Sequence, residues 1–447
     1  MARRGLRFLA AGLLDQAVLA SANAAMTLLP LGLWGTSTPR ASNTVLTIGL
    51  GYLVLGLSRE FVGAVLLAQG SRLAGDQRDR LVRHGQAAAV ALGTVAALVL
   101  LGIWLLWPHP TAKIDLSLLV WLAPFLPVVL FHDAGRYTYL SAGAPAAALV
   151  VDLVWAGTQA AALLAALLTG HLTPGVLLAS WGVGACAGAA TFAVRTRARP
   201  WRGDPRRWIA ETRTLSGWFT ATAVIGQVQV QAVGFVVRGG LSDGDLAVLR
   251  SGQAALLQPV QNLVTAMMGL LVPRLSRLAG TGDGAGLRRL TLRLAGAFVA
   301  LAAVLVAVVV PLARVLLPHL RHYAAILPIA VPVTLQAGIY LVQIPFTAAM
   351  RGMHRARLLF VQYLTFATIS LSGLVFGARA GGLRGATWGL ATGSAAGLLV
   401  MIGLYLVAAV ALPAGPSAGS PGSDPSPGSP AGGTAPVPQR AASPDTR

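Results

Sequence analysis

The sequence has little charge for its length. Only 11% of its 447 residues are charged, whereas 55% are apolar. An ordinary soluble domain carries about 25% charged residues. This chain therefore lacks the polar surface that a water-exposed fold needs, and its composition predicts a polytopic membrane protein.

Cysteine, lysine and acidic residues are scarce as well. The single cysteine, Cys186, excludes an intramolecular disulfide. Lysine occurs only as Lys113, and 14 acidic residues stand against 34 basic ones, which gives a formal net charge of +20. A basic balance can indicate nucleic-acid binding, but these arginines form short clusters between long apolar runs. No nucleic-acid partner is therefore expected.

The sequence also lacks the residue patterns of an enzyme. Its seven histidines show no metal-ligand spacing, and no Gly-Lys-Ser phosphate loop is present. Every connection between apolar runs is short, whereas membrane glycosyltransferases usually place catalytic acids on a large external loop. We therefore expect no enzyme, no metal and no cofactor, and energy for transport would come from a H⁺ or Na⁺ gradient or from another protein.

Long apolar runs dominate what is present. About 20 apolar residues are needed to cross the roughly 30 Å hydrocarbon core of a bilayer. The first run follows Arg3, Arg4 and Arg7 as a signal peptide would, but Asp15 interrupts it early and it continues to Leu33, so we interpret it as a membrane helix. The sequence predicts an all-α protein with twelve spans, at 8–34, 42–70, 86–107, 114–132, 144–169, 173–194, 214–237, 246–273, 290–317, 323–350, 358–378 and 385–411.

The basic residues predict an orientation. Cytoplasmic loops of membrane proteins carry an excess of Lys and Arg. With the N-terminus inside, 25 basic residues fall on the cytoplasmic side, among them Arg136 in a predicted loop at 133–143, and 7 fall on the other side. Both termini are thus predicted to be cytoplasmic, in a multi-pass protein of the cell membrane. Arg59 and Arg250 remain inside predicted spans.

The most basic loop divides the spans into six and six. Two segments repeat across this division: SRLAG at 71–75 recurs at 276–280, and Gly143 corresponds to Gly352. An even number of spans returns the chain to the same side, so duplicated halves would be related by an axis along the membrane normal. The predicted organisation is an N-terminal lobe at 1–194, a basic cytoplasmic linker at 195–213, a C-terminal lobe at 214–411 and a disordered cytoplasmic tail rich in Pro, Gly and Ser at 412–447.

Polar residues in the first two spans are candidates for a transport cavity. Charged groups inside a membrane normally face a bundle interior or a watery cavity. Asp15, Gln16 and Asn23 fall within about 100° of one another on a helix; they either bind a proton or cation, or Asp15 pairs with a loop arginine. Arg59 and Glu60 are consecutive, so they need separate partners or one hydrated cavity, and Arg59 either holds a phosphate or forms an interhelical ion pair.

The fifth and seventh spans carry further polar pairs. Asp152 and Gln159 lie seven residues apart on one face, which favours a polar contact between helices over ligand binding. Gln227 and Gln231 lie four apart on one face of the seventh span. They either line a water-filled path or form interhelical hydrogen bonds.

The eighth span is the richest in polar residues. Arg250, Gln253 and Gln261 project within about 80° of one another, with Gln258 at the edge. Pro259 frees a backbone carbonyl and permits a bend, so it is a candidate hinge. The predicted cavity thus comprises Asp15, Gln16, Asn23, Arg59, Glu60, Asp152, Gln227, Gln231, Arg250, Gln253 and Gln261.

Several of these segments resemble the multidrug/oligosaccharidyl-lipid/polysaccharide (MOP) flippase superfamily, in its actinobacterial polysaccharide-exporter-like form. The resemblance covers residues 5–411, and its motifs are diffuse. It rests on Leu13-Leu14-Asp15-Gln16 through Asn23, on Leu57-Ser58-Arg59-Glu60, on Ala134-Gly135-Arg136-Tyr137 continuing to Asp152, and on Leu249-Arg250-Ser251-Gly252-Gln253 with Pro259 and Pro273-Arg274.

The resemblance implies two six-helix lobes, as in MATE transporters, that rock around a central cavity between inward-open and outward-open states. The polysaccharide branch of this superfamily moves polyprenyl-pyrophosphate-linked sugars, for which Arg59 and Arg250 would suit the pyrophosphate. The multidrug branch exchanges cations for protons or sodium. Asp15 lies where a first-helix acid serves coupling there, but its local motif does not match well enough to assign the role.

The predicted function is therefore a flippase or exporter of lipid-linked oligosaccharide or polysaccharide precursor. A MATE-type multidrug transporter and a major-facilitator transporter are alternatives. The latter's loop motif is matched only in part by Leu73-Ala74-Gly75-Asp76-Gln77-Arg78-Asp79-Arg80. A further alternative is a transport-inactive scaffold. Expected partners are membrane lipids, a polyprenyl-pyrophosphate-linked sugar and envelope glycosyltransferases.

Overall fold

The computed structural model describes residues 2–34, 39–106, 116–319 and 324–410. Within these ranges every regular element is helical and none is a strand. The all-α prediction is therefore confirmed. The tail predicted at 412–447 lies outside the described residues.

The elements up to residue 196 form one group of packed helices, which we call the N bundle. In this bundle α6 packs against α1 and α7, and α3 packs against α5. Its elements are α1 (Ala2–Trp34), α2 (Pro39–Ser58), the π-helices η1 (Arg59–Gly63) and η2 (Leu66–Gly70), α3 (Gly75–Leu106), α4 (Leu119–Leu122), the 3₁₀ helix η3 (Ala123–Phe125), α5 (Leu126–Ser141), α6 (Pro145–Leu168) and α7 (Pro174–Thr196).

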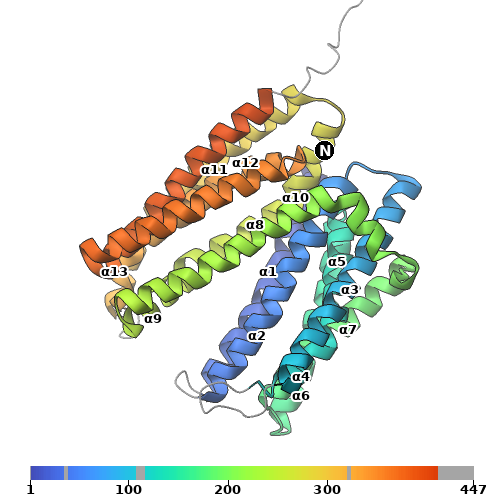
Figure 1. Ribbon diagram of the computed structural model, residues 1–447, viewed down its shortest axis with the longest axis horizontal. Helices are drawn as coiled ribbons and strands as arrows, with labels where there is room; N and C mark the ends of the chain where they lie inside the picture. Colours follow the sequence, from blue (N-terminus) through green and yellow to red (C-terminus); the bar gives the residue numbers. More distant parts are fainter. Residues whose placement is uncertain (1, 35–38, 107–115, 320–323, 411–447) are drawn as a thin grey trace, which may run out of the picture.

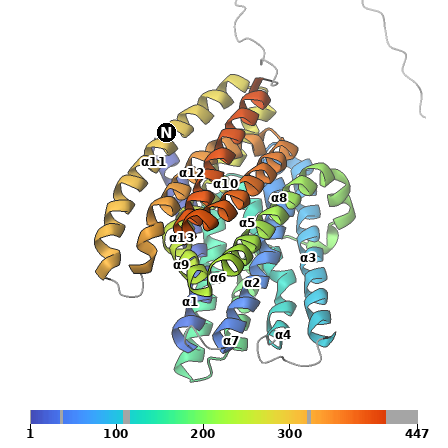
Figure 2. The same ribbon diagram turned by 60° about the vertical axis from the view of Figure 1, so that its left-hand side comes forward.

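The elements from α8 onward form a second group, the C bundle. Its α12 packs between α11 and α13, and α13 also packs on α8. The helices of the two bundles are inclined to one another (Figure 1), and Figure 2 shows α11 and α12 side by side. The elements are α8 (Pro205–Gly240), α9 (Asp243–Gly252), the π-helix η5 (Gln253–Leu257), α10 (Gln258–Gly280), α11 (Gly284–Leu316), the 3₁₀ helices η6 (Leu317–His319) and η7 (Ala324–Ile326), α12 (Leu327–Gly352) and α13 (Ala356–Val410), preceded by the 3₁₀ helix η4 (Pro200–Arg202).

Ten helices in the described ranges are long and apolar enough to cross a membrane. One of them, α13, contains two helices, because its backbone leaves the helical conformation at Gly381 and Gly382. The φ angle of 57° at Gly382 is one that residues with a Cβ rarely adopt. This break lies between the two spans predicted at 358–378 and 385–411.

The fourth predicted span is shifted along the chain. It is formed by α4, η3 and α5, in which Pro124 and Pro127 interrupt the helix near its start. The helix then continues to Ser141, nine residues beyond the predicted end at 132. Residues 133–141, predicted as a loop, are therefore helical, which moves Arg136 from a loop into the bundle.

Local signals define several helix starts. The side chains of Thr173, Asp204, Ser242 and Asp283 each accept a backbone N–H of the first turn of the helix that follows, which satisfies donors that have no partner within the helix. Two of these caps, Asp204 and Asp283, begin helices beside the most arginine-rich connections. They therefore fix where α8 and α11 start.

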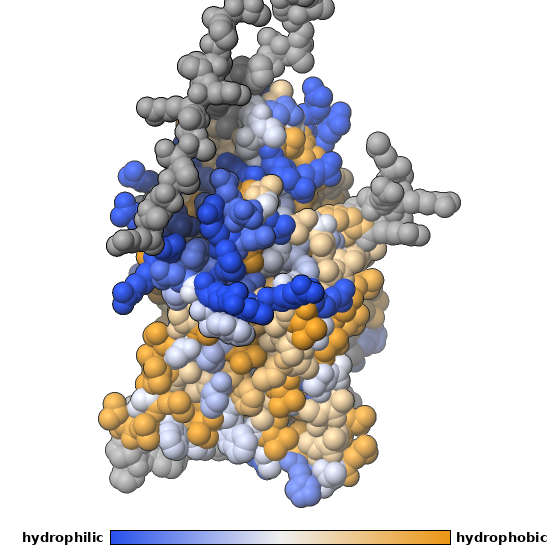
Figure 3. All heavy atoms as spheres, turned by 90° about the vertical axis from the view of Figure 1, so that its right-hand side faces the viewer, coloured by the Kyte–Doolittle hydropathy of each residue, from blue (hydrophilic) through white to orange (hydrophobic). Residues whose placement is uncertain are grey.

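Hydrophilic side chains gather at one end of the molecule. Figure 3 shows them above a broad apolar band on one face. Contacts of Arg72 with Ser276 and Gly352, and of His84 with Asp204, join the arginine-rich segments 71–85, 195–213, 274–293 and 351–357. We call the end of the molecule where these segments lie the basic end. Large apolar side chains such as Leu106, Phe235 and Leu399 are instead 83%, 76% and 70% exposed. An exposed apolar belt of this kind fits the hydrocarbon of a bilayer.

Candidate functional site

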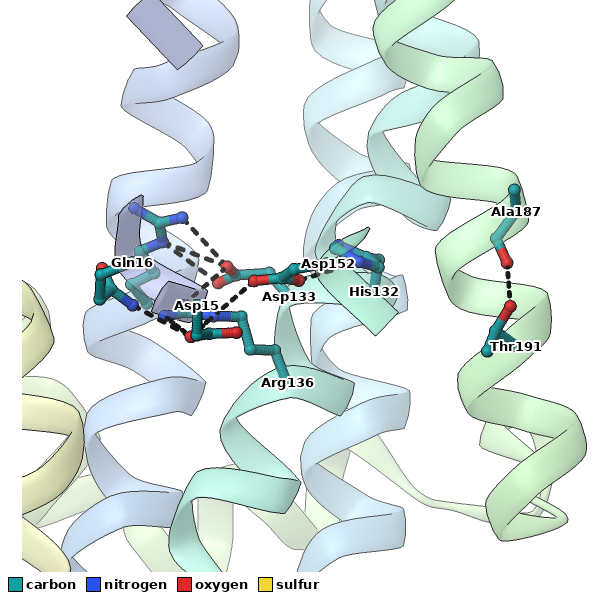
Figure 4. A network of polar contacts seen from close by, with 9 residues as sticks. Asp15, Gln16, His132, Asp133, Arg136, Asp152, Ala187 and Thr191 are labelled. Carbon is teal, nitrogen blue, oxygen red and sulfur yellow. Dashed lines mark hydrogen bonds and ion pairs between the residues drawn. The ribbon is translucent and has the colours of Figure 1, made fainter. Parts of the chain in front are cut away.

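A network of buried charges joins three helices of the N bundle. Arg136 of α5 is 1% exposed, and its Nη2 and Nε donate to Asp15 Oδ2 of α1 at 3.0 and 3.1 Å. Its Nε also lies 3.0 Å from Asp152 Oδ2 of α6. Figure 4 shows these side chains pointing toward one another from their helices. Buried charges are tolerated only when they are paired, so this guanidinium and its two carboxylates depend on one another.

An ion pair and a histidine–carboxylate contact extend this N-bundle network. Arg59, at the start of η1, donates from Nη2 to Asp133 Oδ1 at 3.1 Å and from Nε to both carboxylate oxygens at 3.3 Å. His132 Nε2 lies 3.4 Å from Asp152 Oδ1. The network thus contains three carboxylates, two guanidiniums and one imidazole. With His132 neutral its formal charge is −1, a charge that one proton or one small cation would balance.

The space beside Arg59 is small. Asn23, Arg59 and His132 line a cavity of about 10 Å³. A cavity of this volume has room for about one water molecule, which is too small for a phosphate. In this structure Arg59 forms an interhelical ion pair with Asp133, which is one of the two roles predicted for it.

A larger cavity lies between the bundles and continues into the C bundle. Its first part has a volume of about 430 Å³ and its second about 370 Å³, and the two share Val230, Gln261, Tyr340 and Tyr363. We call both parts together the central cavity. Amides and hydroxyls dominate its polar lining, from Thr222, Gln227, Gln229, Gln253, Gln258, Gln261, Thr265, Gln336, Tyr340, Gln343, Thr347, Gln362 and Tyr363.

Three charged side chains line the central cavity. Glu60 and Arg351 lie in its first part and Arg250 in its second, which gives the lining a formal charge of +1. Arg351 Nη2 donates to Glu60 Oε1 at 2.9 Å across the two bundles, and its guanidinium lies 5.1 Å above the ring of Phe219. Arg250 donates to the Val230 carbonyl at 3.1 Å. A cation–π contact and an ion pair thus hold Arg351 in place at the edge of the cavity.

The two copies of the SRLAG repeat meet at the basic end. Arg72 of the first copy donates from Nε to the hydroxyl of Ser276, in the second copy, at 2.9 Å, and from Nη2 to the Gly352 carbonyl. The Ser276 hydroxyl in turn donates to the Ala68 carbonyl of η2. These bonds, together with the Glu60–Arg351 pair, form what we call the inter-bundle contact. It joins the two bundles at the basic end, and its Glu60–Arg351 pair lines the first part of the central cavity.

His354 lies beside the inter-bundle contact, in the connection between α12 and α13. Burial and, to a smaller extent, the charge of Arg72 lower the pKa of its imidazole to about 4. Because an unfolded histidine titrates near pH 6.5, the unfolded chain binds more protons between pH 6.5 and 4. Stability should therefore be complete above pH 6.5 and fall as the pH drops through this window.

Replacing His354 with asparagine is expected to flatten this acid dependence. Asparagine tolerates the left-handed φ of 59° found at this position. The measurement is the melting temperature of detergent-solubilised protein from pH 7.5 to 4.5. Parallel curves for the parent and His354→Asn would show that His354 does not contribute.

The structure divides the predicted cavity residues between two places. Asp15, Asp152 and Arg59 belong to the N-bundle network; Gln16 donates to Asp15 at 3.4 Å, and the backbone of Asn23 accepts from Tyr52 at 3.0 Å. Glu60, Gln227, Arg250, Gln253 and Gln261 line the central cavity. Gln231 is exposed and lines neither part of the central cavity. Gln229, which was not predicted, lines the second part. Pro259 is the second residue of α10, directly after η5, so the irregular turn lies just before the predicted hinge.

Sequence reasoning misses several residues of both sites. Arg136 and Arg351 fall in predicted loops, and Asp133 at a loop boundary, because predicted spans four and ten end too early. Four further cavity residues lie inside predicted spans: Tyr340, Gln343, Gln362 and Tyr363. Gln227 was selected because it is polar within an apolar span, and the same criterion would also find Gln343 and Gln362. Consecutive Arg59 and Glu60 have separate partners, which is one of the two arrangements that their spacing allows.

The chain is similar to known proteins in its fold but not in its sequence. No protein-family model matches the chain, and no curated protein matches it in sequence. Solved structures do match. A mutant form of the Vibrio cholerae MATE transporter VcmN has a TM-score of 0.75 at 14% identity, covering 91% of this chain and 96% of that one.

Two further structures agree with the first. A multidrug resistance MATE family transporter of the MOP superfamily, in an outward-facing conformation, matches with a TM-score of 0.73 at 12% identity over 91% of this chain and 96% of its own. A MOP superfamily transporter from Pyrococcus furiosus matches with a TM-score of 0.75 at 12% identity, over 91% and 95%. At these identities the similarity concerns architecture, and the chain has the fold of the MATE transporters of the MOP superfamily.

Proposed function

We propose that this protein is a membrane transporter that moves a lipid-linked oligosaccharide or polysaccharide precursor across the cell membrane by alternating access. The observation that carries the proposal is the lining of the central cavity. Neutral amides and hydroxyls make up most of its polar surface, and its formal charge is +1. Such a lining suits a polyhydroxylated, phosphorylated head group better than a cation.

Each part of this cargo has a counterpart in the cavity. Sugar hydroxyls both donate and accept hydrogen bonds, as glutamine amides do. The phosphates would lie at Arg250 or Arg351, because guanidinium groups bind phosphate through two parallel N–H donors. For Arg351 this means that a phosphate competes with Glu60, its present partner at 2.9 Å.

The direction of transport follows from the placement of basic residues. By the positive-inside rule we assign the basic end, and with it both termini, to the cytoplasm. The inter-bundle contact then joins the two bundles at the cytoplasmic end. Loading from that side requires this contact to open, and export requires it to close again behind the cargo.

The test is flipping of a fluorescent polyprenyl-pyrophosphate oligosaccharide in proteoliposomes. Arg250→Ala and Arg351→Ala should each lower the initial rate about 10- to 100-fold, since a hydrogen bond to a charged group contributes about 1.5–3 kcal/mol. Arg379→Ala removes an exposed arginine outside the cavity and is the matched control. Parent-like rates in both cavity variants would refute the phosphate assignment.

Cation-coupled efflux is a second candidate, which the N-bundle network favours. That network has one carboxylate more than its guanidiniums and buries Asp15 completely. In this case Asp15→Asn should abolish proton-driven efflux of a cationic dye from vesicles, whereas Arg250→Ala should not. Dye efflux that is absent from the parent protein would exclude this candidate.

A further inference from the structure

A third cavity lies at the basic end of the N bundle, away from the central cavity. Its volume is about 780 Å³, and it is lined by the first turns of α3, the ends of α5 and α7, and the connection that leads to η4. Its charged lining consists of six arginines and two aspartates, a formal charge of +4, from Asp76, Arg78, Asp79, Arg80, Arg83, Arg197, Arg199 and Arg202. We call it the arginine pocket.

The connection that supplies three of these arginines is fixed to α3. The backbone N–H of Asp204 donates to Nδ1 of His84 at 2.9 Å. Gly203 lies so close to the Arg83 carbonyl that a Cβ at this position would overlap it. Trp208, at the start of α8, is fully buried against Gly85. The segment predicted as a cytoplasmic linker is therefore docked, and the backbone that carries its arginines is fixed before any ligand binds.

Donors in the arginine pocket are available. In the described part of the chain no ion pair joins its arginines to a carboxylate. Arg78 donates from Nη2 to the Thr138 carbonyl at 3.1 Å, while its buried Nε has no partner. Gln86 lines the pocket, is 2% exposed, and its Oε1 has no hydrogen-bond partner. A buried amide without a partner is costly unless a ligand or water satisfies it.

The arginine pocket lies at the edge of the apolar belt. Trp201, between Arg199 and Arg202, is 77% exposed, and Val194, near the end of α7, is 78% exposed. Tryptophan is enriched where a membrane protein meets the lipid head groups. Figure 3 shows hydrophilic side chains directly above apolar ones on this side of the molecule.

We propose that the arginine pocket binds the head group of an anionic glycerophospholipid of the leaflet that meets the basic end. The phosphate accepts from the arginines, a glycerol hydroxyl donates to Gln86, and the acyl chains lie along the exposed apolar surface beside Val194 and Trp201. Basic pockets between membrane helices bind such head groups through the same charge complementarity. This site is separate from the central cavity and does not depend on the identity of the cargo.

The experiment is native mass spectrometry of the full-length protein in detergent, titrated with phosphatidylglycerol or phosphatidylcholine. The parent should bind at least one phosphatidylglycerol about tenfold more tightly than phosphatidylcholine. A triple variant, Arg197→Ala/Arg199→Ala/Arg202→Ala, should lose this preference, as should Arg80→Ala/Arg83→Ala on α3. The matched control, Arg288→Ala/Arg289→Ala/Arg293→Ala, removes the same charge from exposed positions on α11 and should keep it.

Each remaining outcome would overturn the proposal. Equal binding of both lipids by the parent would show that no anionic site exists. An equal loss in the α11 control would mean that net charge, and not the pocket, attracts the lipid. If inorganic phosphate or glycerol 3-phosphate displaces phosphatidylglycerol at equal concentration, the pocket recognises free phosphate instead of a lipid. Size-exclusion profiles identical to the parent establish that the variants are folded.

Discussion

Replacing Arg136 with alanine is expected to destabilise the protein by about 3–5 kcal/mol, because it leaves two buried carboxylates without a partner. Asp15 and Asp152 are both fully buried, and Arg136 lies within 3.1 Å of each. Removing one member of a buried charge network costs more than the network itself contributes. The measurement is the free energy of unfolding in detergent, or the melting temperature where unfolding is irreversible.

The control removes the charges together. A triple variant, Asp15→Asn/Arg136→Met/Asp152→Asn, replaces the three charges with uncharged side chains of similar size and should recover most of the lost stability. The stability of Arg136→Lys should lie between that of the parent and that of Arg136→Ala, since a lysine has no planar group that bonds two carboxylates at once. Arg195→Ala, at an exposed position on α7, should be neutral. A stable Arg136→Ala protein would show that the carboxylates are protonated or solvated without the arginine.

The helical architecture could be predicted because it depends on composition and on the length of apolar runs. Apolar length alone does not determine where a helix ends. The predicted fourth and tenth spans end too early, so Arg136 and Arg351 were predicted to lie in loops. The fourth span continues through Asp133 and Arg136 because these residues find buried partners on other helices of the N bundle. Their hydropathy predicts a loop, and only tertiary pairing overrides it.

Cavity residues could be predicted where their side chains are charged or strongly polar within an otherwise apolar helix. Arg250 and Glu60 stand out in the sequence and line the central cavity. Tyrosines do not stand out, although Tyr340 and Tyr363 join the two parts of the cavity. The glutamines of α8 could not be assigned from the sequence either. Gln227, Gln229 and Gln231 are spaced two and four residues apart, and this spacing does not specify which face of the helix lines the cavity. That choice depends on how α8 packs against α13.

The SRLAG repeat was a weak signal in a sequence so rich in alanine and leucine, and the structure gives it a physical meaning. Arg72 of one copy and Ser276 of the other are bonded at 2.9 Å where the bundles meet. The second residue of one copy thus bonds to the first residue of the other. The two copies of the repeat therefore form part of the surface on which the two bundles meet.

Weakening the inter-bundle contact is expected to open the central cavity toward the basic end. Arg72→Ala removes the bonds to Ser276 and Gly352, and Glu60→Gln replaces an ion pair with a neutral hydrogen bond. Bonds of charged groups contribute about 1.5–3 kcal/mol each, and about 1.4 kcal/mol corresponds to a tenfold change in population. The double variant should therefore increase the open population roughly 100-fold.

Thiol accessibility measures this opening directly. With Cys186 replaced by alanine, Thr265→Cys places one thiol in the central cavity, and a membrane-impermeant maleimide is added from the basic-end side of oriented vesicles. Labelling should be about 100-fold faster in the Arg72→Ala/Glu60→Gln background than in the parent. Arg277→Ala, at the equivalent position of the second repeat, is the matched control, because Arg277 bonds to Pro273 within its own helix at 3.2 Å. Equal labelling rates in the double variant and the parent would show that apolar packing, and not these polar bonds, holds the bundles together.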